Sequence, residues 1–192
     1  MLDECNYRGC VDAMGKSTQI QLIENELERR HKAVHIVHYS NIKFTKDNKE
    51  IENASAIRYR EMFNLMKKTD DTNVIIFDRA HLGETVYSPL YRGYTGDFVF
   101  QFEKDFIEGE HPETKLILFT DTVENVIARD KARGDGLSFT LDPEKKADEL
   151  KAFDMAFENS WLDKKRISLN GRTPEEIYEQ DVFPFIFGDK NE

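Results

Sequence analysis

Short apolar runs alternate along this chain with longer segments in which apolar residues recur at helical spacing. The segment NVIIFD at 73–78 is apolar and rich in β-branched residues, which predicts a buried strand. KLILFT at 115–120 has the same character. Between such runs, Ile20 and Ile23 lie on one face of a helix predicted over 16–31. The alternation of strands and helices predicts an α/β fold with a mainly parallel sheet covered on both faces.

The complete pattern predicts a single domain over residues 1–192, in which a five-stranded parallel sheet is flanked by helices in three layers. Thr173 is expected to cap the last helix, because TPEE places Pro at the first helical position and Glu three residues after the cap. Strands are predicted at 2–9, 33–39, 73–78, 115–120 and 166–170. The other helices are predicted at 16–31, 53–68, 97–108, from about 122, and at 143–162.

Composition narrows the partners that this domain can take. The net charge is −10 and the sequence pI is near 5.1. DNA and RNA binders need a basic surface, so this balance argues against a nucleic acid polymer, whereas a few local cations suffice for a nucleotide. No apolar run reaches the length of a membrane span, and early acidic residues argue against a signal peptide. If the first strand extends over 2–10, Cys5 and Cys10 lie on its opposite faces, which argues against a disulfide and suits free thiols in a reducing cytoplasm.

A phosphate-binding loop is predicted at 10–18, CVDAMGKST, between the first strand and the helix that follows it. Backbone N–H groups at the helix start would hold the phosphates of ATP, with Lys16 on the β- and γ-phosphates and Ser17 on Mg²⁺. Cys10 stands where the usual pattern has glycine, and an ordinary strand–turn–helix corner is the alternative. The expected nucleotide contacts are Asp12, Ala13, Met14, Gly15, Lys16, Ser17 and Thr18.

Asp12 needs a partner, because a carboxylate beside a triphosphate is unfavourable unless it faces a donor. That donor is either an acceptor hydroxyl or the N–H groups of the loop, unless Asp12 simply points to solvent. The loop resembles that of the thymidylate kinase family, phage-encoded members in particular, which reads GLDGAGKT. The resemblance runs over most of the chain at low overall similarity. It implies a P-loop nucleoside monophosphate kinase fold and a contact from Asp12 to the sugar 3′-hydroxyl.

Asp78 and Arg79 directly follow the strand at 73–78, where ligands of open parallel sheets bind. A guanidinium binds phosphate oxygens in a forked geometry and keeps its charge. The resembling family has Asp-Arg here, which implies that Arg79 holds the acceptor phosphate and that Asp78 lies near the reacting phosphates or Mg²⁺. Tyr87 matches an aromatic that lines the family's sugar–base pocket. The alternatives are a structural ion pair for Asp-Arg and helix packing for Tyr87.

The stretch SAIRY at 55–59 resembles the family's SANRW, at the same distance before Asp-Arg. This implies that Arg58 contacts the acceptor nucleotide. However, the family's stacking Phe falls on Ala54, and its Arg after the second strand is missing. Three aromatic residues could supply the stacking surface, or could equally pack in the core: Tyr39, Tyr59 and Phe63.

A short lid is expected at approximately 129–143, because RDKARG resembles the bacterial-type thymidylate kinase lid. The resemblance implies that Arg129 and Arg133 neutralise charge as the γ-phosphoryl group transfers. Gly134 and Gly136 suit a segment that closes. A solvated, charged helix end is the alternative.

Together these motifs predict an enzyme that transfers the γ-phosphoryl group of ATP, with Mg²⁺, to a pyrimidine deoxynucleoside monophosphate such as dTMP or a modified dUMP. Two alternatives stay open: a deoxynucleoside kinase that uses Asp78 or Glu84 as a base for a 5′-hydroxyl, and a nucleotide-binding module without catalysis. The resemblance also implies a homodimer and, for a phage-encoded member, the host cytoplasm. The expected catalytic residues are Lys16, Arg79, Arg129 and Arg133.

Overall fold

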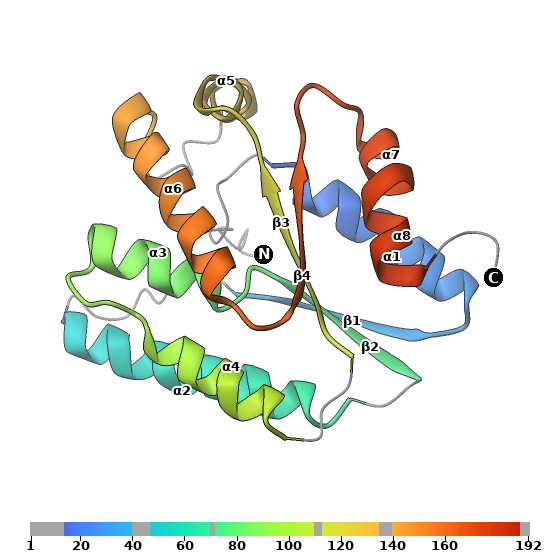
Figure 1. The fold of residues 1–192 in the computed structure, drawn as a ribbon, viewed down its shortest axis with the longest axis horizontal. Coiled ribbons are helices and arrows are strands. Elements are labelled where there is room, and N and C mark those ends of the chain that lie inside the picture. Colours follow the sequence, from blue (N-terminus) through green and yellow to red (C-terminus); the bar gives the residue numbers. More distant parts are fainter. Residues whose placement is uncertain (1–13, 40–46, 70–71, 110–112, 135–139, 189–192) are drawn as a thin grey trace, which may run out of the picture.

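The structure is a computed structural model of the chain, and it describes residues 14–39, 47–69, 72–109, 113–134 and 140–188. Two parallel strand pairs form the centre of this part of the chain (Figure 1). One pair is β1 (Ala33–His38) with β2 (Asn73–Asp78), and the other is β3 (Lys115–Thr120) with β4 (Asp163–Ser168). Parallel pairing brings the carboxyl ends of partner strands together, so that His38 lies opposite Asp78.

Within the described residues the strands form two two-stranded sheets, and the expected five-stranded sheet is not shown. The strand expected at 2–9 lies outside those residues. β4 also differs from its prediction, because it begins at Asp163 and not at 166. Its first residues are charged and give no apolar pattern. They join the ladder through β3, with an ion pair of 2.6 Å between Nζ of Lys115 and Oδ2 of Asp163.

Helices surround the strand pairs and mostly begin near their predicted positions. In Figure 1, α2 lies beside α4 and α3 lies near α6, whereas α1 packs on β1 and β2. A π-helical turn at Tyr178–Val182 joins the last two helices. None of the described helices is long and apolar enough to cross a membrane. The helices are α1 (Lys16–Arg29), α2 (Asn48–Met66), α3 (Leu82–Tyr91), α4 (Phe98–Ile107), α5 (Val123–Arg133), α6 (Pro143–Asn159), α7 (Pro174–Ile177) and α8 (Phe183–Phe187).

The helix starts follow local chemistry. Thr173 caps α7 in a full capping box with Glu176, which confirms the reading of TPEE. The side chains of Asp47, Thr122 and Asp142 cap α2, α5 and α6, since each accepts from one or two backbone N–H groups of the first turn.

α3 is absent from the predicted helix ranges, although packing of Tyr87 in a helix was one alternative, and Gly83 and Pro89 both disfavour a helix interior. The helix forms nevertheless, since Leu82, Val86 and Tyr87 are all buried along one face. Burial of this apolar face outweighs the weak local propensity. α3 matters for the site because it starts just after Asp78 and Arg79.

The core has two parts. The larger part lies among α1, α3, α5, α6 and the strands, and Val86, Val126 and Val182 in it are fully buried. The smaller part joins α2 to α4 through Met62, Phe63, Val99, Phe106 and neighbours. The two parts hold the strand pairs so that β1 and β2 end close to the start of α1.

Candidate functional site

The described end of the predicted phosphate loop is a tight turn into α1. Gly15 has φ 68° and ψ 14°, in the left-handed region that glycine adopts at little cost. Met14 is buried, Lys16 is half-buried, and Ser17 and Thr18 are exposed. Within the described residues no side chain caps this helix start, and its first turn contains no acidic residue. A glycine in this conformation at the start of a helix is typical of backbone that presents N–H groups to an anion, and Lys16 is the first residue of α1.

Part of the predicted site lies outside the described residues. This holds for Asp12 and Ala13 in the loop, for Cys10 before them, and for 135–139 in the lid. The contacts expected of Asp12 and Ala13 stay predictions.

His38 and Asp78 meet at the carboxyl ends of β1 and β2. Nδ1 of His38 lies 3.0 Å from Oδ2 of Asp78, and a carboxylate oxygen can only accept, so Nδ1 donates. Burial lowers the pKa of His38 and outweighs the opposing effect of Asp78, while the charges of Arg79 and Lys16 lower this pKa further. Lys16 thus acts electrostatically on His38, and the start of α1 lies near the ends of these strands.

Arg79 follows Asp78 and has an unusual backbone. Its φ is 75°, in the left-handed region, and its side chain is buried. For a residue other than glycine this conformation costs about 1 kcal/mol or more, and it is often found at functional sites. The structure therefore keeps Arg79 at the predicted strand end in a conformation that the surrounding contacts must enforce.

Arg129 connects α5 to the phosphate loop. Nη2 of Arg129 lies 2.6 Å from Oδ2 of Asp121 and 3.7 Å from Sδ of Met14. Asp121 directly follows β3, and its carboxylate is almost fully buried. Burial tends to raise the pKa of Asp121, but hydrogen bonds from Asn125 and Arg129 outweigh burial and lower it. The structure thus places Arg129 next to Met14, a residue of the predicted phosphate loop.

Arg133 lies one helical turn further along α5 and belongs to a buried charged network. Its Nη2 is 3.2 Å from Oδ1 of Asp130. Nζ of Lys146, on α6, is 3.6 Å from Oδ2 of Asp130 and 2.8 Å from Oε2 of Glu149. The hydroxyl of Tyr91 donates to Glu149 at 2.6 Å. The network ties α5, α6 and α3 together.

Arg58 lies over the ring of Tyr39, with its guanidinium carbon 5.6 Å from the ring centroid. The Tyr39 ring meets Tyr59 edge-on at 6.0 Å and stacks on Phe77 at 6.1 Å. Of the three aromatic residues considered for stacking, Tyr59 and Phe63 are buried, whereas Tyr39 is half-buried. Tyr39 and Arg58 therefore form a partly exposed pair beside the end of β1.

Tyr87 and Glu84 both point into the protein. The Tyr87 ring is buried and lies 5.6 Å from the ring of Phe153, as in the packing alternative. Glu84 is buried and accepts hydrogen bonds from Ser88, Arg92 and Tyr94, at 3.0, 3.1 and 2.5 Å. A carboxylate with three donors is poorly suited to act as a general base.

Two site residues were missed from the sequence: His38 and Asp121. Each stands at or just after the carboxyl end of a strand, which is the position that drew attention to Asp78. The same positional rule would have identified both.

A magnesium ion fits the donor set here. Oδ1 of Asp78 is buried, and no described residue hydrogen-bonds it, so a lone pair is open to a cation. The exposed hydroxyl of Ser17, in the first turn of α1, supplies a second oxygen of the type that Mg²⁺ prefers. Within the described ranges no cluster of His, Cys, Asp and Glu forms a ready-made metal site. The ion would thus depend on substrate phosphates for further ligands.

Comparisons with known proteins match this chain to a solved structure, but not to a family model or a curated sequence. No protein-family model matches the chain, and no curated protein sequence matches it. Among solved structures, the YorR protein of Bacillus subtilis, crystallised in complex with phosphorylated GDP, superposes with a TM-score of 0.60. The match covers 90% of this chain and 89% of YorR. The two proteins share a fold. Their sequences are 16% identical, so the likeness concerns the α/β arrangement and not the individual side chains.

Proposed function

We propose that this protein is a phosphotransferase that moves the γ-phosphoryl group of ATP onto a pyrimidine deoxynucleoside monophosphate. One observation carries the proposal: the turn at Gly15 and Lys16, the Asp78–Arg79 strand end and Arg129 converge on one region of the sheet edge. A helix start of the kind that binds polyphosphates thus lies together with two further cations, Arg79 and Arg129. The YorR complex supports it, because a protein of the same fold was crystallised with a phosphorylated nucleotide.

Each residue has a distinct role in the proposed reaction. The N–H groups after Gly15 and the Lys16 ammonium hold the β- and γ-phosphates, and Arg79 holds the acceptor phosphate with help from Arg58. Arg129 neutralises charge on the transferring group, and Arg133 adds to this field from one turn away. Ser17 and Asp78 would hold Mg²⁺, which supplies further charge neutralisation when bound. The acceptor phosphate oxygen is already anionic, so the transfer needs no strong base.

A deoxynucleoside kinase is the second candidate, and the His38–Asp78 pair is the observation that favours it. A carboxylate held by a histidine at a strand end could accept the proton of a 5′-hydroxyl. Asp78 fits this role better than Glu84, whose oxygens are already occupied by three donors.

A substrate screen tests the proposal. The full chain with ATP and Mg²⁺ is assayed against deoxynucleoside monophosphates and the matching nucleosides, with Lys16→Ala as the inactive control and Lys151→Ala, on the exposed face of α6, as the matched neutral control. We expect turnover of dTMP or another pyrimidine monophosphate, and at least a 100-fold loss in Lys16→Ala only. Turnover of deoxythymidine without dTMP would favour the second candidate. ATP binding with no transfer to any acceptor would overturn both.

A further inference from the structure

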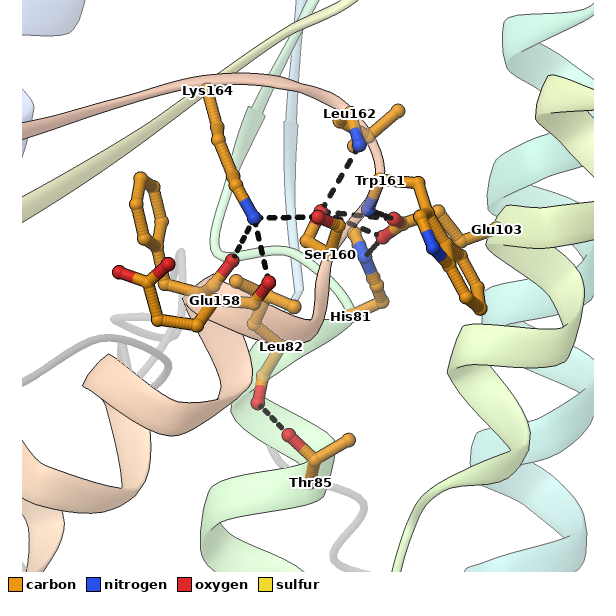
Figure 2. Close-up of polar contacts among 10 residues, drawn as sticks. His81, Leu82, Thr85, Glu103, Glu158, Ser160, Trp161, Leu162 and Lys164 are labelled. Carbon is orange, nitrogen blue, oxygen red and sulfur yellow. Dashed lines mark hydrogen bonds and ion pairs between the residues drawn. The ribbon is translucent and has the colours of Figure 1, made fainter.

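His81 and Glu103 form a buried hydrogen-bonded pair just beyond the Asp78–Arg79 strand end. Nε2 of His81 lies 2.5 Å from Oε2 of Glu103, and both side chains are at most 1% exposed. Figure 2 shows the imidazole of His81 directed at the Glu103 carboxylate. His81 also begins α3, because its carbonyl accepts from the N–H of Glu84 at 2.9 Å.

Glu103 is also held by residues at the end of α6. Its carboxylate accepts from the Ser160 hydroxyl at 2.9 and 3.1 Å and from the backbone N–H of Trp161, at the end of α6 (Figure 2). Burial alone would raise the pKa of Glu103, but the hydrogen bonds from His81, Trp161 and Ser160 outweigh it and lower the pKa. Glu103 is therefore a carboxylate, and Nε2 of His81 carries the donated proton.

The end of α6 is itself anchored. Nζ of Lys164 donates to the carbonyls of Phe157, Glu158 and Ser160, at 2.7, 2.8 and 2.6 Å. Carbonyls in the last turn of a helix lack the usual i+4 partner, and the Lys164 ammonium supplies donors to these three, of which Phe157 also accepts from the N–H of Ser160. The His81–Glu103 pair thus connects the loop after β2 to two rigid elements, α4 and the α6 terminus.

The arrangement does not form a catalytic triad. The Ser160 hydroxyl donates to Glu103 and not to His81, so no serine is activated by the imidazole. His81 is also fully buried, with its ring 5.1 Å from that of Phe63 in the smaller core. A structural role toward a neighbouring residue explains the pair better than contact with a substrate.

That neighbour is Arg79, which lies between two histidine–carboxylate pairs. On one side, Asp78 is held by the β1–β2 ladder and by His38; on the other, His81 is held by Glu103. Only Ala80 separates His81 from Arg79, so the two anchors leave the intervening backbone little freedom. The unfavourable φ of 75° at Arg79 occurs within this short span.

We propose that His81 and Glu103 are positioning residues that hold Arg79 in its left-handed conformation, and so aim its guanidinium at the acceptor phosphate. The inference rests on the proposed function, since it assigns the role of Arg79 to acceptor binding. Loss of the pair lets the backbone of Arg79 relax, which weakens a contact with the acceptor but leaves the ATP site intact.

Steady-state kinetics with His81→Phe and Glu103→Gln test this inference. Phe fills the space of His81 beside Phe63 but removes the donor, and Gln keeps the shape of Glu103 but weakens its acceptor strength. We expect the KM for the monophosphate to rise about tenfold in each variant, with the KM for ATP changed by less than about twofold. Phe106→Leu, in the same core but outside the pair, is the matched control and leaves the KM for the acceptor unchanged.

A double-mutant cycle with Arg79→Ala separates positioning from general destabilisation. If the pair acts through Arg79, His81→Phe has no further effect on the acceptor KM once Arg79 is Ala. If the effects of His81→Phe and Arg79→Ala on the acceptor KM are fully additive, the inference is overturned. It is also overturned if both His81→Phe and Glu103→Gln have the same acceptor KM as Phe106→Leu. In either case the turnover of the wild-type protein still supports the proposed function. A wild-type protein that transfers phosphate to no monophosphate overturns the proposed function and this inference with it. Glu103→Gln supplies the cycle where His81→Phe does not fold.

Discussion

His38 and Asp78 form the last residue pair of the parallel β1–β2 ladder, and their side chains also meet, with Nδ1 of His38 3.0 Å from Oδ2 of Asp78. The pair lies where two strands deliver their final side chains to the same edge of the sheet. Lys16 and Arg79 act on it electrostatically, so this edge combines a carboxylate with several cations. Such a combination suits the binding of phosphates together with a divalent cation.

The lowered pKa of His38 makes stability depend on pH. Because folding lowers this pKa from its ordinary 6.5, the unfolded chain binds more protons than the folded chain below about pH 6.5. The free energy of unfolding should therefore fall as the pH drops through this range, and His38→Gln should reduce that fall. Urea denaturation at pH 7, 6 and 5 measures it. A slope in His38→Gln equal to that of the wild-type protein would contradict the expectation.

Glycine is required at position 15 because of the backbone conformation there, and not because a larger side chain would lack room. A Cβ added there meets no atom of the described residues within 4 Å, yet its φ is 68°. We expect Gly15→Val to destabilise the protein by about 1–2 kcal/mol and to raise the KM for ATP, with a smaller effect in Gly15→Asn, since Asn tolerates this region better. Thermal unfolding and ATP kinetics measure both effects. Gly188→Ala, at φ 79° and equally open space near the end of α8, should lose stability without any change in ATP kinetics.

Arg129 should act on the transferring phosphoryl group. Arg129→Ala is expected to lower kcat by about 10²–10³, because its loss removes charge near Met14. It should also destabilise the protein by about 1–3 kcal/mol, because the buried Asp121 carboxylate loses its ion-pair partner. Asp121→Asn should produce a smaller loss by releasing the guanidinium. Lys131→Ala, exposed on the same helix, serves as the control. A kcat in Arg129→Ala equal to that of Lys131→Ala would remove Arg129 from the mechanism.

Lys146 should be important for stability. Its ammonium is 1% exposed and lies between the buried carboxylates of Asp130 and Glu149. Lys146→Met leaves these two carboxylates without their shared cation, which is expected to destabilise the protein by about 3–5 kcal/mol. Chemical denaturation measures the loss. Lys145→Met, at the neighbouring exposed position, should change the free energy of unfolding by less than about 0.5 kcal/mol, and a similar value for Lys146→Met would contradict the expectation.

The sequence predicted the local elements well. The strands at 73–78 and 115–120 have the observed bounds, and the cap at Thr173 was identified from four residues. These features depend on side-chain periodicity and on hydrogen bonds within one turn, which a short stretch of sequence contains completely. Where the local pattern is weak, the prediction failed. α3 was missed because its own helix propensity is poor, and the predicted start of β4 was too late because the first residues of this strand are charged.

The sequence by itself determined which residues stand at strand ends and helix starts, and hence the candidates Lys16, Asp78 and Arg79. Only the tertiary structure decided which distant groups hold them in place. His38 reaches Asp78 across 40 positions, and Glu103 reaches His81 across 22. The physical reason is that these partners are brought together by the pairing of strands and the packing of helices, and no local pattern records which buried carboxylate a histidine will meet.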